Sequence, residues 1–167
     1  MMNDSGSATI IRSTVSGNSS TGPSGNGAIY NFEADLDIID SAFTGNTSTT
    51  SVGALQNFAG TTNIANSVFA GNSSVNTSGA VLNNAAGVMT ITNSAFIGNR
   101  AGNVGGALTN NTLSTVSITN STFAGNNGSN GGGGIAILGA GTTSITNSIV
   151  WGNNGNTLTG ATITYSI

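Results

Sequence analysis

The sequence contains no cysteine, no histidine and no lysine, and its only basic residues are Arg12 and Arg100. Without cysteine the chain has no disulfide framework and no thiolate metal site. Without histidine it cannot form a Ser-His-Asp catalytic set. Two cations cannot neutralise a run of phosphates, so we expect no nucleic-acid binding, and anionic membrane surfaces are poor partners for the same reason.

Charge of either sign is scarce, at 4% of residues, and the formal net charge is −3. The five acids all fall within the first quarter of the chain, at Asp4, Glu33, Asp35, Asp37 and Asp40. No apolar run approaches 18 residues, so we expect no membrane insertion. Residues 1–4 lack the basic and apolar regions of a signal peptide. Regular aliphatic and aromatic positions argue against disorder.

A nine-residue pattern, Ile-x-x-Ser-x-(Phe/Val)-x-Gly-Asn, occurs six times at a spacing of about 27 residues. A second, shorter pattern, Gly-Ala-aliphatic-x-Asn, lies between the copies, with its Asn at positions 31, 57, 83 and 110. A fixed period of this length is typical of stacked repeat architectures. Both patterns are short, alternate in polarity and are rich in Ile, Val, Thr and Phe, which favours strands over helices.

We therefore predict an all-β, right-handed parallel β-helix (a β-solenoid) of about six coils of about 27 residues each. Residues 1–167 would form one domain, with 1–7 as an irregular N-terminal lead and 8–165 as repeats. We expect neighbouring coils to pair in register at about 4.8 Å.

Stacking in register would place equivalent residues of successive coils above one another. One interior column is expected at Ile10, Ile38, Ile64, Ile91, Ile118 and Ile145, and a second at Val15, Phe43, Phe69, Phe96, Phe123 and Val150. The Gly of each Gly-Asn pair would supply the positive φ of a sharp corner. The Asn residues that follow would bond side chain to side chain as a ladder, at Asn18, Asn46, Asn72, Asn99, Asn126 and Asn153.

A second Asn ladder is expected at Asn66, Asn93, Asn120 and Asn147, with Arg12 and Asp40 in its first two positions. The Ser of each copy is expected to bond the backbone at the bend.

Two segments carry a family resemblance. Residues 118–126, Ile-Thr-Asn-Ser-Thr-Phe-Ala-Gly-Asn, and residues 105–110, Gly-Gly-Ala-Leu-Thr-Asn, resemble the FxxN and GGA[I/L/V] motifs of polymorphic outer-membrane-protein repeats. The two segments also resemble the wider pectate-lyase-like right-handed β-helix superfamily of bacterial surface and secreted proteins. The resemblance covers roughly residues 8–165. It implies the fold, and leaves enzymes, adhesins and passive stalks open.

Glu33, Asp35 and Asp37 alternate, so on a strand all three would face one way, with Asp40 near the following bend. They are weak candidates for a Ca²⁺ site or an acid–base pair. A solvated acidic rim is the simpler interpretation. A lyase would need several acids and a base in one groove, whereas Arg12 is the only base nearby. We therefore expect no catalytic residues and no enzymatic activity.

Thr and Ser flank the repeated Ile in three consecutive copies, at Thr90/Thr92, Ser117/Thr119 and Ser144/Thr146. Stacked, they would form a flat, uncharged hydroxyl face that could bind a glycan or ice. Exposed strands also favour Thr for its shape alone. In earlier copies Asp37/Ile39 and Asn63/Ala65 interrupt the array.

The run Gly131–Gly134 lacks the Lys and Ser/Thr of a phosphate loop, so we expect a flexible or tightly turning loop and no cofactor. Trp151 is expected to point outward, where it could anchor a partner.

These features predict a non-catalytic extracellular or cell-surface structural protein: a stalk or adhesin segment, or a filament subunit stacking end to end. No capping segment is visible, so the column would continue in a longer β-helix or add copies of itself. A glycan- or ice-binding module is the alternative, and a polysaccharide lyase is a weaker one.

Overall fold

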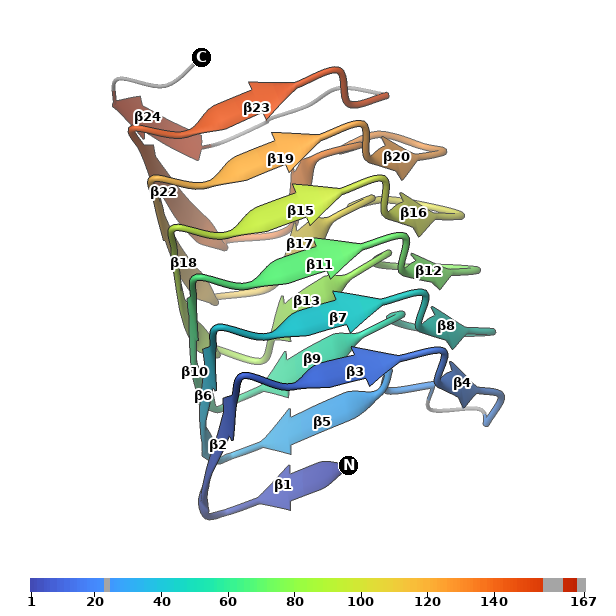
Figure 1. Ribbon diagram of the computed structural model, residues 1–167. Helices are drawn as coiled ribbons and strands as arrows, with labels where there is room; N and C mark the ends of the chain where they lie inside the picture. The colour runs from blue at the N-terminus through green and yellow to red at the C-terminus, as the bar shows by residue number, and fades with distance from the viewer. Residues whose placement is uncertain (23–24, 155–160, 165–167) are drawn as a thin grey trace.

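The computed structural model describes residues 1–22, 25–154 and 161–164. Each of the five complete coils contains four short strands, and equivalent strands of successive coils pair in parallel to build four sheets (Figure 1). The chain climbs as it runs along the near face through β3 and β7 and returns on the far face through β5 and β9, which makes the coil right-handed. The predicted parallel β-solenoid is confirmed.

The strands of the four sheets have the following bounds. Sheet A contains β1 (Met2–Asp4), β5 (Ile29–Phe32), β9 (Leu55–Phe58), β13 (Val81–Asn84), β17 (Leu108–Asn110) and β21 (Ile135–Ile137). Sheet B contains β2 (Ser7–Ile11), β6 (Asp35–Ile39), β10 (Thr61–Ala65), β14 (Val88–Thr92), β18 (Thr115–Thr119), β22 (Thr142–Thr146) and β24 (Ala161–Thr164). Sheet C contains β3 (Thr14–Ser16), β7 (Ala42–Thr44), β11 (Val68–Ala70), β15 (Ala95–Ile97), β19 (Thr122–Ala124) and β23 (Ile149–Trp151). Sheet D contains β4 (Ser19–Ser20), β8 (Thr47–Ser48), β12 (Ser73–Ser74), β16 (Arg100–Ala101) and β20 (Asn127–Gly128).

The solenoid makes about five turns where six were predicted. Five complete coils run from β1–β4 to β17–β20, and a sixth contributes β21, β22 and β23. In that sixth coil Asn154 bridges to Asn127 of β20, and residues 155–160 lie outside the described residues.

The apolar core is a set of columns that run along the solenoid axis. The predicted Ile and Phe columns are confirmed: Ile38 to Ile145 and Phe43 to Phe123 are in register and buried, and Ile10, Val15 and Val150 at the ends pack against them. The rings of Phe43, Phe69, Phe96 and Phe123 stack nearly parallel, with centroids 4.6, 4.9 and 4.6 Å apart. Each ring therefore fills the space directly above the last.

The ladder of Asn18 to Asn153 is confirmed and stabilises the corner between sheets C and D. Asn72 is representative: its Nδ2 donates to Asn99 Oδ1 at 3.0 Å and to the carbonyl of Phe43 at 2.9 Å. Its backbone amide also donates to Asn99 Oδ1, at 3.0 Å. The preceding Gly has the predicted positive φ, 60° at Gly71 and 60° at Gly98. These bonds satisfy amides that would otherwise be buried without partners.

The corner between sheets B and C carries the two other predicted features. Arg12, Asp40, Asn66, Asn93, Asn120 and Asn147 all have φ between 46° and 52°. Asn66 donates to Asp40 at 3.0 Å, Asn93 donates to Asn66 at 3.3 Å, and Asn147 donates to Asn120 at 2.6 Å, so the predicted ladder forms in these three steps on the exposed surface. The adjacent Ser bonds backbone as expected: Ser67 Oγ donates to Ala65 O at 2.7 Å and accepts from Ser41 N at 3.0 Å.

Residues 1–7 are not the irregular lead that we predicted. Met2–Asp4 form β1, which pairs in register with β5, and Ser7 begins β2. Asn3 is the reason, because its Nδ2 donates to Asn31 Oδ1 at 2.7 Å and to Asp35 O at 2.8 Å. It starts a buried ladder through Asn31, Asn57, Asn83 and Asn110 that stabilises the corner between sheets A and B.

The described residues form no helix long and apolar enough to cross a bilayer.

Candidate functional site

The predicted hydroxyl face is the outer surface of sheet B. Thr90, Ser117 and Ser144 stand in one register column, and Thr92, Thr119 and Thr146 stand in another. Between them the buried Ile column holds each strand flat against the core. The six predicted residues are therefore brought together on one face.

The array is larger than the sequence pattern indicated. Strand β24 adds Thr162 to the first column and Thr164 to the second. Thr115 and Thr142 form a third column, with their Oγ1 atoms 3.2 Å apart. Towards the N-terminal end the same columns pass through Asp37/Ile39 and Asn63/Ala65, so the array is confined to the C-terminal half as expected.

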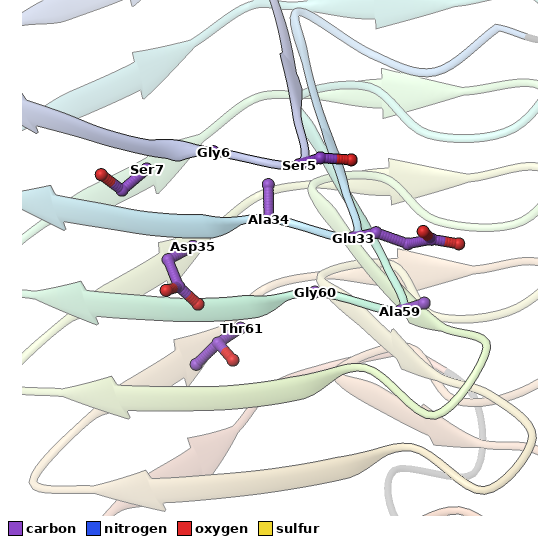
Figure 2. Close-up of a pocket in the computed structure, with 9 residues that line it drawn as sticks. All are labelled: Ser5, Gly6, Ser7, Glu33, Ala34, Asp35, Ala59, Gly60 and Thr61. Atoms are coloured by element: carbon purple, nitrogen blue, oxygen red, sulfur yellow. The ribbon is translucent and has the colours of Figure 1, made fainter.

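The prediction that Glu33, Asp35 and Asp37 share one face is wrong. Asp35 and Asp37 lie on the outer side of β6, but Glu33 stands at the preceding corner with φ of 48°. This left-handed residue breaks the alternation of the strand, and Figure 2 shows the Glu33 and Asp35 side chains pointing to opposite sides of Ala34. Asp37 accepts from Asn63 at 2.9 Å, and Asp40 lies at the next corner.

No group of three or more acidic side chains comes close enough to hold a metal ion in the ranges that the structure describes. Asp35, Asp37 and Asp40 are instead spread along β6 and its following corner, and the Glu33 side chain extends away from Asp35. The carboxylates thus do not converge on one point.

Glu33 and Asp35 do border a trough at the corner between sheets A and B. Its volume is about 600 Å³. Its floor is the stack of small residues Gly6, Ala34 and Gly60, and its two rims are Ser5, Glu33 and Ala59 on one side and Ser7, Asp35 and Thr61 on the other (Figure 2). A Cβ on Gly60 would lie 2.7 Å from Asn31 Nδ2, so the buried Asn ladder lies directly behind this floor.

Three aromatic side chains lie beside the trough, and the sequence analysis did not single them out. Tyr30, Phe32 and Phe58 project from the outer side of sheet A and are each half-buried. Phe32 and Phe58 stack with centroids 5.5 Å apart, and Tyr30 lies 5.8 Å from Phe32. The signal was present, because Asn31 and Asn57 must face inward to join a ladder and their neighbours must then face outward.

Burial raises the pKa of the Tyr30 hydroxyl above its ordinary value, and the negative charges of Glu33 and Asp4 raise it further. Both carboxylates therefore lie within electrostatic range of the Tyr30 hydroxyl. Asp4 is the register partner of Phe32 and accepts from Ser5 Oγ at 3.0 Å.

The outer surface of sheet C is apolar over much of its length. Val68, Ile97, Ile149 and Trp151 are exposed there, and Trp151 points outward as predicted, with 73% of its surface accessible. The face is only three residues wide by six strands, on the order of 300 Å² at normal strand spacing. That is well below the area of about 800 Å² per partner that a stable interface buries.

The glycine run is the tight turn that we expected. Gly131 and Gly132 have φ of 129° and 58°, and strand β21 follows the run rather than a helix. A Cβ on Gly133 would overlap the backbone of Asn154. These glycines allow the chain to pass close to the neighbouring coil.

Comparisons of the chain with protein-family models, with curated proteins and with solved structures found no match.

Proposed function

We propose that the chain is a non-catalytic structural module, a rigid rod that acts outside the cell as a stalk, an adhesin segment or a filament subunit. The observation that carries the proposal is that the Asn18–Asn153 ladder runs through all five complete coils, and that the Phe column runs through four of them, with Val15 in its place in the first. Buried polar side chains are used to join coils and corners, and only Gln56 Oε1 and Ser74 Oγ are buried without a partner in the described part of the chain.

Location outside the cell rests on the resemblance of residues 105–110 and 118–126 to polymorphic outer-membrane-protein repeats. That family assignment, and the wider pectate-lyase-like superfamily, are part of the proposal. A lyase is disfavoured because Arg12 lines no part of the trough that contains Glu33 and Asp35.

We further propose that the column lengthens by parallel strand addition, either with more coils of the same protein or with a second copy. In a parallel ladder alternate amides point to opposite neighbours. Asp35 N donates to Gly6 O, so Asp35 and Asp37 direct their amides toward β2. By the same alternation Thr9, in register with Asp37, directs its amide away from β6, at the edge of sheet B in the described residues.

A Thr9→Pro variant tests this proposal. Proline would remove the outward amide without breaking a bond to β6, and edge strands tolerate it. In negative-stain microscopy and sedimentation over a range of concentrations, we expect the parent and a Thr9→Ala control to form columns longer than one chain. Thr9→Pro should remain as short particles. Short particles for the parent at every concentration, or equally long columns for Thr9→Pro, would overturn end-to-end assembly.

A second candidate function is recognition of an ordered water layer, as in ice, by the hydroxyl face. The specific observation in its favour is that β24 continues both Thr/Ser columns in register. The hydroxyls repeat at about 4.8 Å along the axis and about 6.6 Å along each strand. Thr119→Tyr should abolish inhibition of ice recrystallisation, whereas Thr122→Tyr, on sheet C of the same coil, should not. An inactive parent chain would end this alternative.

A further inference from the structure

The aromatic cluster of Tyr30, Phe32 and Phe58 has no role in the stacked core. The inward residues of the same strands, such as Ile29, Asn31 and Leu55, already form the core and the ladder. Four of the six Phe residues are in the buried column, and Phe32 and Phe58 are the other two. Stacked rings left half-exposed on a polar surface indicate a binding surface.

Carboxylates surround these rings on two sides. Asp4 stands beside Phe32 on the neighbouring strand, and Glu33 follows Phe32 directly. Both raise the pKa of the Tyr30 hydroxyl, so the three groups lie within electrostatic range of one another. Neither Arg12 nor Arg100 lines the adjoining trough, and the local charge is negative.

The trough extends the same surface around the corner onto sheet B. Its rim residues Ser5, Glu33 and Ala59 directly follow Asp4, Phe32 and Phe58 in the chain, so the two features share one boundary. Beyond that boundary the trough offers the Ser7 and Thr61 hydroxyls and the Asp35 carboxylate (Figure 2).

We propose that this corner binds a cationic amino sugar, a hexosamine unit with a free amine within a glycan. A sugar ring presents a C–H face that packs on aromatic rings, which Phe32 and Phe58 offer. A protonated amine is attracted both to a ring face and to carboxylates. The sugar hydroxyls find acceptors and donors in the trough. A neutral sugar would form no ion pair with these carboxylates, and an acidic sugar would be repelled by them.

In later coils the corner between sheets A and B carries no acidic residue. The residues equivalent to Glu33 are Ala59, Ala85 or Ala86, and Leu113, all with positive φ. No acid occurs after Asp40. The site is therefore specific to the first three coils, which makes it separable from the stacking that forms the rod.

The experiment is a titration of the full chain, followed by amide NMR shifts, with a fully deacetylated chitin tetramer as the probe. It is carried out at about pH 6, where carboxylates are ionised. The N-acetylated tetramer serves as the uncharged comparison. We expect the deacetylated tetramer to bind with shifts at residues 4–7, 30–35 and 58–61, and the acetylated one to bind at least about tenfold more weakly, the value of one charge-assisted hydrogen bond.

Charge-matched variants isolate the site. Glu33→Gln should weaken binding by about tenfold. Asp40→Asn makes the same change of net charge at the opposite end of β6, where Asn already occupies the column, and should leave binding unchanged. For the aromatic contribution, Phe32→Ala should lose binding and Trp151→Ala should not.

The proposal would be overturned by no binding of the deacetylated tetramer, by equal losses in Glu33→Gln and Asp40→Asn, or by equal affinity for the acetylated tetramer. Binding of oligolysine as tight as that of the amino sugar would also overturn it, in favour of a cationic peptide. None of these results bears on the proposed rod function, because Glu33 and Phe32 take no part in the stacked columns.

Discussion

Truncation of Asn99 to alanine should destabilise the solenoid far more than its small size suggests. The side chain is fully buried and takes part in four hydrogen bonds. Its Nδ2 donates to Phe69 O and to Asn126 Oδ1, both at 2.9 Å, and its Oδ1 accepts from the backbone and side-chain nitrogens of Asn72, both at 3.0 Å.

Four such bonds contribute about 2–6 kcal/mol in all, at about 0.5–1.5 kcal/mol each. Asn99→Ala also leaves the buried backbone amide of Asn72 without its acceptor, which costs more than a simple loss of bonding. We therefore expect a loss of about 4 kcal/mol in the free energy of unfolding. That is a large part of the 5–15 kcal/mol by which a typical domain is stable.

The assay is urea denaturation followed by far-ultraviolet circular dichroism, with Asn93→Gly as the control. Asn93 is exposed, has φ of 49° that glycine accepts, and makes one 3.3 Å bond to Asn66. The control should lose less than about 1 kcal/mol. If the two variants were equally stable, the buried ladder would not be the stabilising element that we describe.

Three further predictions follow from the packing and charges. Phe96→Ala should lower the free energy of unfolding by about 3–5 kcal/mol. Phe58→Ala, on the outer face, should lower it by about half as much, because the Phe58 ring is already half-solvated. Equal losses in denaturant titrations would contradict the Phe column. Gly106→Ala should prevent folding, because its Cβ would overlap the carbonyl of Gly133. The control Gly98→Asn should fold, because position 98 has φ of 60° and open space around it, and circular dichroism would show the difference. Normal folding of Gly106→Ala would refute the close approach of the coils. In a Tyr165→Phe background, ultraviolet titration should place the Tyr30 pKa above the ordinary value, and Glu33→Gln should lower it. Because the folded state holds this proton more tightly, the free energy of unfolding should fall as the pH rises through the pKa of Tyr30 in the folded state. An unchanged midpoint of the Tyr30 titration in Glu33→Gln would count against the proximity of Tyr30 and Glu33.

The period of the sequence was sufficient to predict the fold and the columns. Residues at equal positions of successive copies lie above one another once the coils pair in register, so Phe69 over Phe96 and Asn72 over Asn99 follow from spacing alone. Asn31, Asn57, Asn83 and Asn110 could have been predicted as a ladder by the same argument. The copy at residues 1–7 was too divergent to recognise, so β1 was missed.

The outer surface was harder to predict because it depends on where each corner lies. Glu33 and Ala59 adopt a left-handed conformation without being Gly or Asn, and no sequence signal marks them. Their position decides that Glu33 stands at the corner next to Phe32, while Asp35 stands on β6 in sheet B. The trough and the aromatic cluster therefore emerge only when the corners are fixed in space.

The central claim is that equivalent side chains of successive coils stack directly along one axis. The most direct test is solution NMR of the chain with labelled Phe and Asn, measuring nuclear Overhauser contacts between the rings of Phe69 and Phe96 and between the side-chain amide of Asn72 and residues of the Asn99 coil. The structure predicts strong contacts for both pairs, which are 27 residues apart in the chain. Contacts confined to neighbours in sequence, or Phe69 paired with a residue outside the column, would contradict the account.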